Sequence, residues 1–249
     1  MSEKTEDNFE RGIFWGLYKD LERQFQDFLE YVPYLPGNET VYSFKLVNLI
    51  LSIGGHVDSI FKEMARYPKF SDNTECREIL GKLKETEGRK EEGKGPITVP
   101  ISLPLKAFEK EYKLSEKKVI FKRISEKLEI IPFTPYNPTT NSPEWWEIYN
   151  GLKHDVGINV EEASLKTTLT ALAGAFLLNA VHIPSVLRLF KHNIFKIEFE
   201  PEVMGGDYSR QIATLDWVRQ QYERTLTLPT MLETPLFIFD YDGWDEYYE

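Results

Sequence analysis

The segment Pro143–Asp155, PEWWEIYNGLKHD, carries the side chains of this sequence that are best suited to chemistry. On a helix, Asn150 and His154 lie four residues apart, so their side chains are neighbours. Tyr149 and Lys153 make a second pair with the same spacing on an adjoining face. As a helix, the segment would therefore present an imidazole, an amide, an ammonium group and a phenol close together.

These groups suit a reaction at a phosphodiester bond. A histidine titrates near neutral pH, so His154 can take a proton from a ribose 2′-hydroxyl or give one to the leaving oxygen. Lys153 and Asn150 can stabilise charge on the phosphoryl oxygens. One histidine cannot easily be both acid and base, and a twofold dimer would supply a second copy.

The same residues also have a purely structural interpretation. Lys153 and His154 in a last helical turn interact favourably with the helix dipole and can bond the last carbonyl groups. Trp145 and Trp146 are large side chains suited to a core. Residue types alone leave both interpretations open.

Apolar side chains spaced three and four residues apart predict the elements that would position this segment. Gly54-Gly55 falls inside one such stripe and predicts a close approach or a kink. Ser142 and Pro143 are typical of an N-cap and of a first helical residue. The predicted helices cover residues 9–32, 40–67, 74–87, 143–155, 161–190 and 208–226.

The sequence between residues 88 and 133 has a different character. GRKEEGKGP (88–96) predicts a mobile loop, and the proline-interrupted run 97–105 predicts extended chain. KKVIFKRI and KLEIIPF, separated by Ser125–Lys127, predict a β-hairpin, although a helix through 114–129 fits as well. A further short strand is expected at Asn193–Glu200.

We therefore expect a mainly α protein: an antiparallel four-helix bundle with a small, possibly β-containing insertion and a C-terminal extension. The expected division is a helical pair at 1–70, the insertion at 71–142, a second pair at 143–191 and the extension at 192–249. The acidic, aromatic tail after Phe239 is expected to fray or to dock on a basic surface.

Composition restricts the class of partner. The net charge of −10 gives no general attraction to nucleic acid or to anionic membranes, so RNA contact needs a local basic patch, for which residues 117–123 are the candidate. The uncharged run Thr167–Leu187 contains Asn179, His182 and Pro184, so it predicts a buried core helix and no membrane span.

Cysteine and histidine placement restricts the site chemistry. Cys76 is the single cysteine, which excludes an intramolecular disulfide and fits a reducing, cytoplasmic location, as does the polar N-terminus. His56, His182 and His192 have no metal-ligand spacing, so neither a metal nor a cofactor is expected.

The order of two helices, an insertion, a short helix with an Asn–x–x–x–His pattern and a long small-residue-rich helix resembles the HEPN superfamily. The resemblance covers about residues 9–67 and 143–190. The family motif is an arginine, a short spacer and a histidine, often with Asn directly after the arginine. Tyr149-Asn150-Gly151-Leu152-Lys153-His154 falls on this motif, with Tyr149 in the place of the arginine.

The resemblance implies a homodimer of a toxin–antitoxin or antiviral defence system that cleaves RNA without metal. His154 would be the general acid/base, Asn150 the positioning amide and Lys153 a partial substitute for the arginine, since Tyr149 lacks its charge. The alternative is a non-catalytic HEPN-like protein that binds a partner protein. Tyr149, Asn150 and His154 would then form a hydrogen-bonded helix end or a dimer contact.

Overall fold

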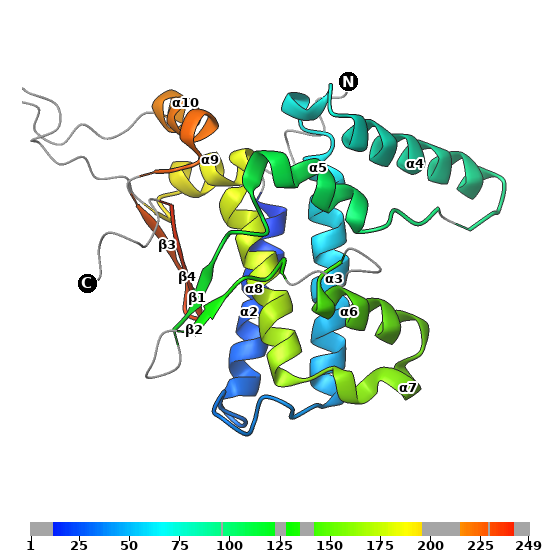
Figure 1. Cartoon of the computed structure of the whole chain (residues 1–249), viewed down its shortest axis with the longest axis vertical. Helices are drawn as coiled ribbons and strands as arrows, with labels where there is room; N and C mark the ends of the chain where they lie inside the picture. The colour runs from blue at the N-terminus through cyan, green and yellow to red at the C-terminus, as the bar shows by residue number, and fades with distance from the viewer. Residues whose placement is uncertain are drawn as a thin grey trace, which may run out of the picture.

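The structure is a computed structural model that describes residues 12–95, 97–122, 128–134, 142–195, 215–228 and 230–241. Over these residues the chain is mainly helical with a small antiparallel sheet, which confirms the predicted fold class at that level (Figure 1). Some predictions fall outside the described residues, namely those for 9–11, 125–127, 196–200, 208–214 and 242–249.

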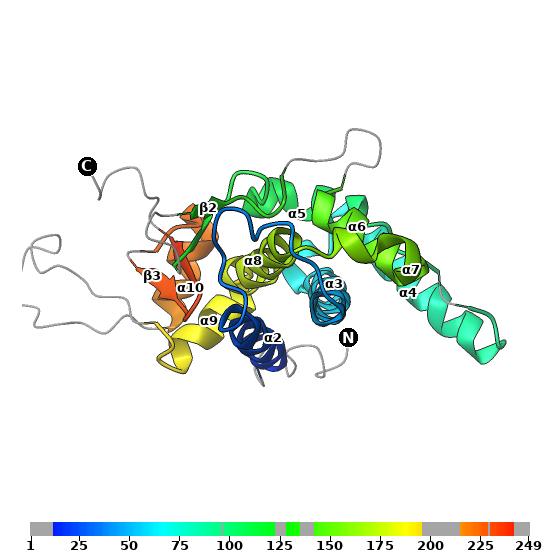
Figure 2. The same ribbon diagram turned by 90° about the horizontal axis from the view of Figure 1, so that it is seen from below.

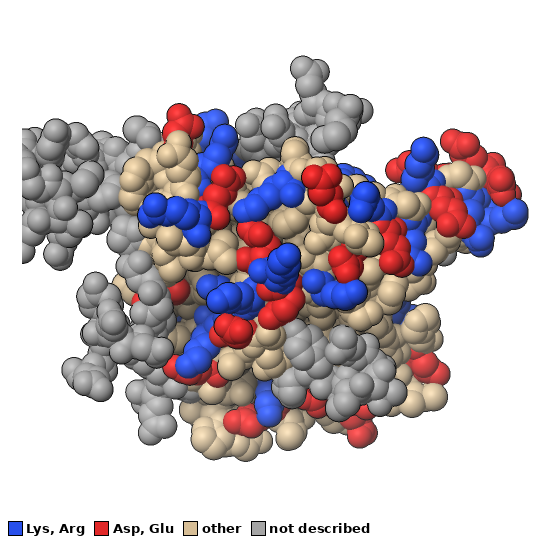
Figure 3. Space-filling model, turned by 45° about the horizontal axis from the view of Figure 1, so that its top comes forward, with Lys and Arg blue, Asp and Glu red and all other residues tan. Residues whose placement is uncertain are grey.

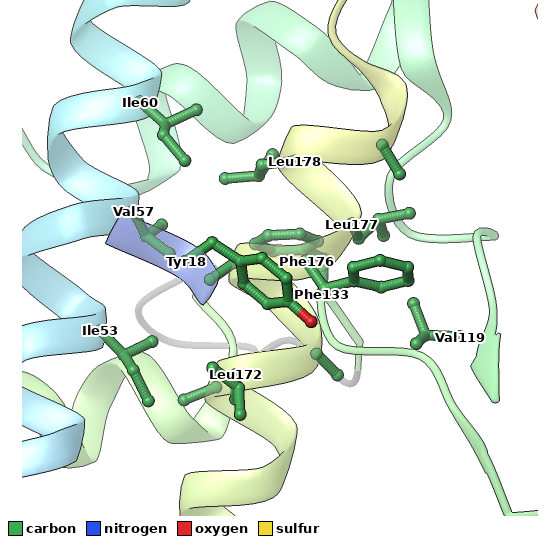
Figure 4. Packing of buried hydrophobic residues seen from close by; sticks show 14 of the residues in the cluster. Tyr18, Ile53, Val57, Ile60, Val119, Phe133, Leu172, Phe176, Leu177 and Leu178 are labelled. Carbon is green, nitrogen blue, oxygen red and sulfur yellow. The ribbon is translucent and has the colours of Figure 1, made fainter. Parts of the chain in front are cut away.

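Three long helices form the centre of the molecule: α2 (Ile13–Leu29), α3 (Phe44–Met64) and α8 (Leu165–Val181). Side chains on every side of α8 are buried, so the predicted buried core helix is confirmed. Figure 4 shows the packing, in which Tyr18 of α2 and Val57 of α3 approach Phe176 of α8. The apolar stripes predicted from the sequence are the faces that meet here.

Helices α3 and α8 begin side by side, and α2 runs in the opposite direction (Figures 1 and 2). Ser43 and Ser164 are the N-caps of α3 and α8, and each hydroxyl accepts a hydrogen bond from the first helical turn. The backbone N–H of Leu165 donates to the carbonyl of Val41 at 2.8 Å, which joins the two helix starts.

The prediction of one continuous helix over 161–190 is wrong. The short elements α7 (Val156–Asn159) and η2 (Val160–Glu162) precede α8, and the chain bends by 78° between α8 and α9 (Ile183–Lys191). Pro184 lies in the first turn of α9. Backbone N–H groups in a first turn have no acceptor within the helix, so a residue without an N–H is tolerated there.

The predictions for residues 88–105 need correction. Helix α4 (Thr74–Glu91) continues into the predicted loop, and α5 (Ser102–Tyr112) replaces the second part of the predicted extended run 97–105, of which residues 97–100 are not helical. Pro104 is in the first turn of α5, a position that tolerates proline. α5 follows the short η1 (Pro68–Phe70) and α4 in the chain, and its Phe108 stacks on Phe61 of α3 at 5.9 Å between ring centroids.

The predicted hairpin is confirmed, and the alternative helix through 114–129 is wrong. β1 (Val119–Phe121) pairs antiparallel with β2 (Leu128–Ile130). The C-terminal run adds β3 (Met231–Glu233) and β4 (Phe237–Asp240), giving the strand order β2-β1-β4-β3. Insertion and extension therefore share one sheet. The described part of the predicted helix 208–226 is α10 (Leu215–Thr225), and residues 193–195 form a turn instead of a strand.

A buried carboxylate fixes this sheet to α2. Glu22 is fully buried, accepts hydrogen bonds from the Tyr18 hydroxyl at 2.9 Å and from the backbone of Leu236 at 3.2 Å, and pairs with Lys19. Since a buried charge needs such partners, Glu22 holds the β3–β4 turn in place.

By length and composition alone, α3 could span a membrane, as could the bent pair α8–α9 counted as one span. Within the protein, 56% of the most apolar stretch of α3 is buried. A buried core helix of a soluble protein can have the same length and the same apolar composition.

Candidate functional site

The candidate site is α6 (Glu144–His154), which matches the predicted helix 143–155 closely. Its start differs by one residue, because Pro143 is the N-cap and the Ser142 hydroxyl contacts the Glu147 carboxylate instead of capping the helix. α6 packs on α3 and α8, and the acidic residues of its first turn suit the helix dipole.

Trp145 and Leu152 anchor α6 to the core. The indole N–H of Trp145 donates to the carbonyl of Pro132 at 2.7 Å, and Leu152 is fully buried. A Cβ atom at Gly174 of α8 would lie 3.3 Å from the Trp145 ring, so the glycine permits this close packing.

Tyr149 also packs inward, contrary to the expectation that its phenol faces water. The residue is 7% exposed and its ring covers Gly54 of α3, which confirms a close approach at the predicted glycine pair. Burial, followed by the charge of Asp58, raises the pKa of the phenol. Tyr149 is therefore a neutral packing residue, where the family motif has a cation.

Lys153 lies next to Tyr149 and is exposed. Its Nζ atom is 5.8 Å from the centroid of the Tyr149 ring, a cation–π distance. Asp58 and Lys62 form an ion pair on the adjoining turn of α3. Lys153 and the charge of Asp58, which is paired with Lys62, therefore act on Tyr149.

His154 is exposed and Asn150 is half-buried. Within the described residues, neither side chain makes a hydrogen bond, so the hydrogen-bonded helix end expected under the non-catalytic hypothesis is not formed by them. Both groups remain able to bind an added molecule. In this single chain no neighbour among the described residues fixes the imidazole.

The helix end is capped by Asn159, a residue that the sequence analysis did not single out. Its amide donates to the carbonyl of Gly151 at 3.0 Å and to that of Asp155 at 2.7 Å. Asp155 in turn accepts from the backbone of Ile158 at 3.2 Å and starts α7. These bonds add to the helix end, where Lys153 and His154 lie in the last turn and suit the helix dipole, as the structural interpretation expects.

The other histidines and the cysteine are placed away from this chemistry. His56 and His182 are buried, and burial lowers their pKa values to about 4 and about 3, so both are neutral at pH 7. Burial raises the pKa of Cys76 to about 11, which makes it an unreactive thiol. No group of three or more His, Cys, Asp or Glu side chains within the described ranges could hold a metal ion.

Of the predicted extra basic contact, residues 117–123, the structure describes residues 117–122, and two of their three lysines pair with carboxylates. Lys118 bonds Glu129 at 3.1 Å, Lys122 pairs with Glu233, and Lys117 lies 6.0 Å from the centroid of the Phe239 ring. On the face in Figure 3, Lys and Arg side chains are interspersed with Asp and Glu. That face therefore offers no continuous basic stripe.

A small cavity lies apart from α6, where α2 meets α8 and α9. Asn179 and Arg188 line it, together with Phe14 and Trp15. The space holds about one water molecule. The side-chain oxygen of Asn179 and one guanidinium nitrogen of Arg188 are buried without a partner within the described residues.

Comparison with models of protein families, with curated proteins and with solved structures finds no match for this chain.

Proposed function

We propose that this chain is a HEPN-like protein that acts on RNA as a homodimer, in the cytoplasm, within a toxin–antitoxin or antiviral defence system. The four helices of the bundle are α2, α3, α6 and α8. The packing of α3 against each of the other three supports this assignment. α6 then takes the position of the motif helix, and the insertion lies between the two helical pairs.

The reaction is cleavage of single-stranded RNA by its own 2′-hydroxyl. The His154 imidazole of one copy accepts the 2′-proton as the 2′-oxygen bonds to phosphorus. The protonated His154 of the second copy donates a proton to the leaving 5′-oxygen, and a 2′,3′-cyclic phosphate remains. Lys153 and Asn150 stabilise the phosphoryl oxygens, a role for which charge-assisted donors are effective.

The observation that carries this proposal is the exposure of His154 beside Asn150 and Lys153 on a helix whose opposite face is locked in the core. An imidazole held by a core contact would be unable to reach a substrate. The same conclusion is supported by the side chains of Asn150 and His154, which make no hydrogen bond within the described residues.

The test is an RNA cleavage assay in excess chelator with end-group analysis. Wild-type protein should leave 2′,3′-cyclic phosphate ends, and His154→Ala should abolish cleavage. His192→Ala is the matched control, because His192 is also an exposed histidine at a helix end. Cleavage that persists in His154→Ala would contradict the assignment of His154 as the general acid/base.

A second candidate, a non-catalytic HEPN-like scaffold that binds a partner protein, is favoured by one observation. The residue in the arginine position, Tyr149, is neutral and faces α3, so the phosphate-facing cation of the motif is missing from its usual place. A stable oligomer that neither cleaves nor binds RNA would establish this candidate over the first.

A further inference from the structure

Exposed apolar side chains gather at one end of the helical body. Six of the eleven large hydrophobic side chains that are exposed within the described ranges belong to the α2–α3 connection, the start of α3 and α7. Figure 1 shows the α2–α3 connection, the start of α3 and α7 at the lower end of the molecule. We call them the apolar end: Tyr31, Leu35, Tyr42, Phe44, Val156 and Ile158.

The two stretches that form the apolar end meet directly. Tyr42 forms an isolated β-bridge with Ser164, and its hydroxyl donates to Glu161 at 3.5 Å. Phe44 is 75% and Ile158 79% exposed, and α7 has no buried residue. Single exposed hydrophobic residues are ordinary, whereas six of them on segments at one end of the molecule indicate a contact surface.

The charges around the apolar end indicate which kind of molecule could bind there. Residues 30–44 and 155–162 carry five carboxylates and no lysine or arginine: Glu30, Glu39, Asp155, Glu161 and Glu162. Lysines occur only at the flanks, as Lys45, Lys153 and Lys166. These carboxylates disfavour an anionic membrane, and a twofold contact with a second copy would place the same carboxylates opposite one another.

We propose that the apolar end is a docking surface for a different protein, one that presents an apolar helix face bordered by lysine and arginine. Such a partner buries Phe44 and Ile158 in its centre and pairs its basic rim with the carboxylates of the two stretches. This surface goes beyond the proposed ribonuclease and does not depend on it, because no residue of the apolar end takes part in the proposed reaction.

The probe is a fluorescent, designed amphipathic helical peptide of leucine and lysine, titrated with full-length protein at low salt. Phe44→Ser/Ile158→Ser should weaken binding about tenfold or more, since central apolar anchors dominate such contacts. Ile13→Ser/Leu17→Ser is the matched control, because both residues are exposed on α2 away from this end, and it should bind as wild type does.

Charge is tested in the same way. Glu161→Lys/Glu162→Lys should weaken binding, whereas Glu85→Lys/Glu87→Lys makes the same change of net charge on exposed α4 and should not. A peptide of leucine and glutamate with the same pattern should not bind. All replaced side chains are exposed, and circular dichroism should match that of wild type.

Several outcomes would overturn the proposal. These are the absence of peptide binding, or an equal loss in the control variants. Sedimentation showing a dimer that Phe44→Ser/Ile158→Ser dissociates would assign the surface to a second copy. Binding to phosphatidylcholine vesicles that the same variant abolishes would assign it to a membrane.

Discussion

The ring of Tyr149 lies directly on the backbone of Gly54: a Cβ atom at Gly54 would be 2.3 Å from Cδ2 of that ring. The contact joins the candidate site helix to α3 and explains two features of the sequence at once. The glycine is needed for the approach of the ring, and the tyrosine fills a space that an exposed arginine would leave empty. At this position the site helix therefore carries a neutral packing residue.

Gly54→Ala should therefore lower the free energy of unfolding by about 3 kcal/mol, because overpacking against a buried ring strains the core. Gly55→Ala is the neighbouring control, since nothing lies within 4 Å of a Cβ atom there, and it should be neutral or stabilise by up to about 1 kcal/mol. Urea denaturation measures both. In a Tyr149→Ala background the cost of Gly54→Ala should largely disappear, and a cost that stays the same would show that the ring is not its cause.

Two buried phenols cap the end of α8. The Tyr222 hydroxyl donates to the carbonyl of Val181 at 2.8 Å, and that of Tyr241 to the carbonyl of Ala180 at 2.6 Å. Tyr222→Phe and Tyr241→Phe should each cost about 1–2 kcal/mol of unfolding free energy, because a buried carbonyl loses its donor. Tyr31→Phe, at an 85% exposed residue, should change nothing measurable. Equal stability of all three variants would exclude this capping role.

His56 should make stability depend on pH. Its pKa is lowered by burial to about 4 in the folded protein, against about 6.5 in an unfolded chain. As pH falls below about 6.5, His56 becomes protonated in the unfolded chain, whereas in the folded chain it becomes protonated only near pH 4. The free energy of unfolding should fall in that window, by up to about 1.4 kcal/mol per pH unit for this group.

His56→Gln should flatten that part of the profile, as measured by urea denaturation between pH 4 and pH 7. His192→Gln, at an exposed position, should leave the slope unchanged. A wild-type slope retained in His56→Gln would assign the dependence to other groups, among them buried His182, whose pKa of about 3 acts in the same direction.

Under the proposed mechanism, Lys153 should supply the positive charge near the phosphate that Tyr149 cannot supply. Lys153→Ala should reduce the rate of RNA cleavage by about 100-fold, the usual cost of losing one stabilising donor at a developing oxyanion. Lys191→Ala, an exposed lysine in the last turn of α9, is the control and should retain the wild-type rate. A normal rate in Lys153→Ala would remove Lys153 from the mechanism.

Helices with a single apolar stripe can be predicted from the sequence. Elements that depend on contacts between residues far apart in the chain cannot. α2, α3 and α6 follow from side-chain spacing, because their stripes become the core. α5 is missed because Pro104 resembles a helix breaker, although it lies in the first turn. The pairing of β1 with β4 joins segments more than a hundred residues apart and leaves no local pattern.

In the candidate site, too, some features follow from helical spacing and others depend on contacts with other segments. Helical spacing places Asn150 and His154 together, but the direction of Tyr149 depends on the space above Gly54 of another helix. The cap by Asn159 depends on the turn after Asp155, which is set by that turn's own hydrogen bonds. Neither has a signal in residue type alone.

The central claim is that one His154 from each of two copies forms a single reaction site. Mixed dimers test it most directly: wild-type and His154→Ala chains are unfolded together, refolded at varied ratios, and assayed for RNA cleavage in excess chelator. The account predicts inactive mixed dimers, so activity should fall as the square of the wild-type fraction. A linear fall, or no cleavage by the wild-type protein, would contradict it.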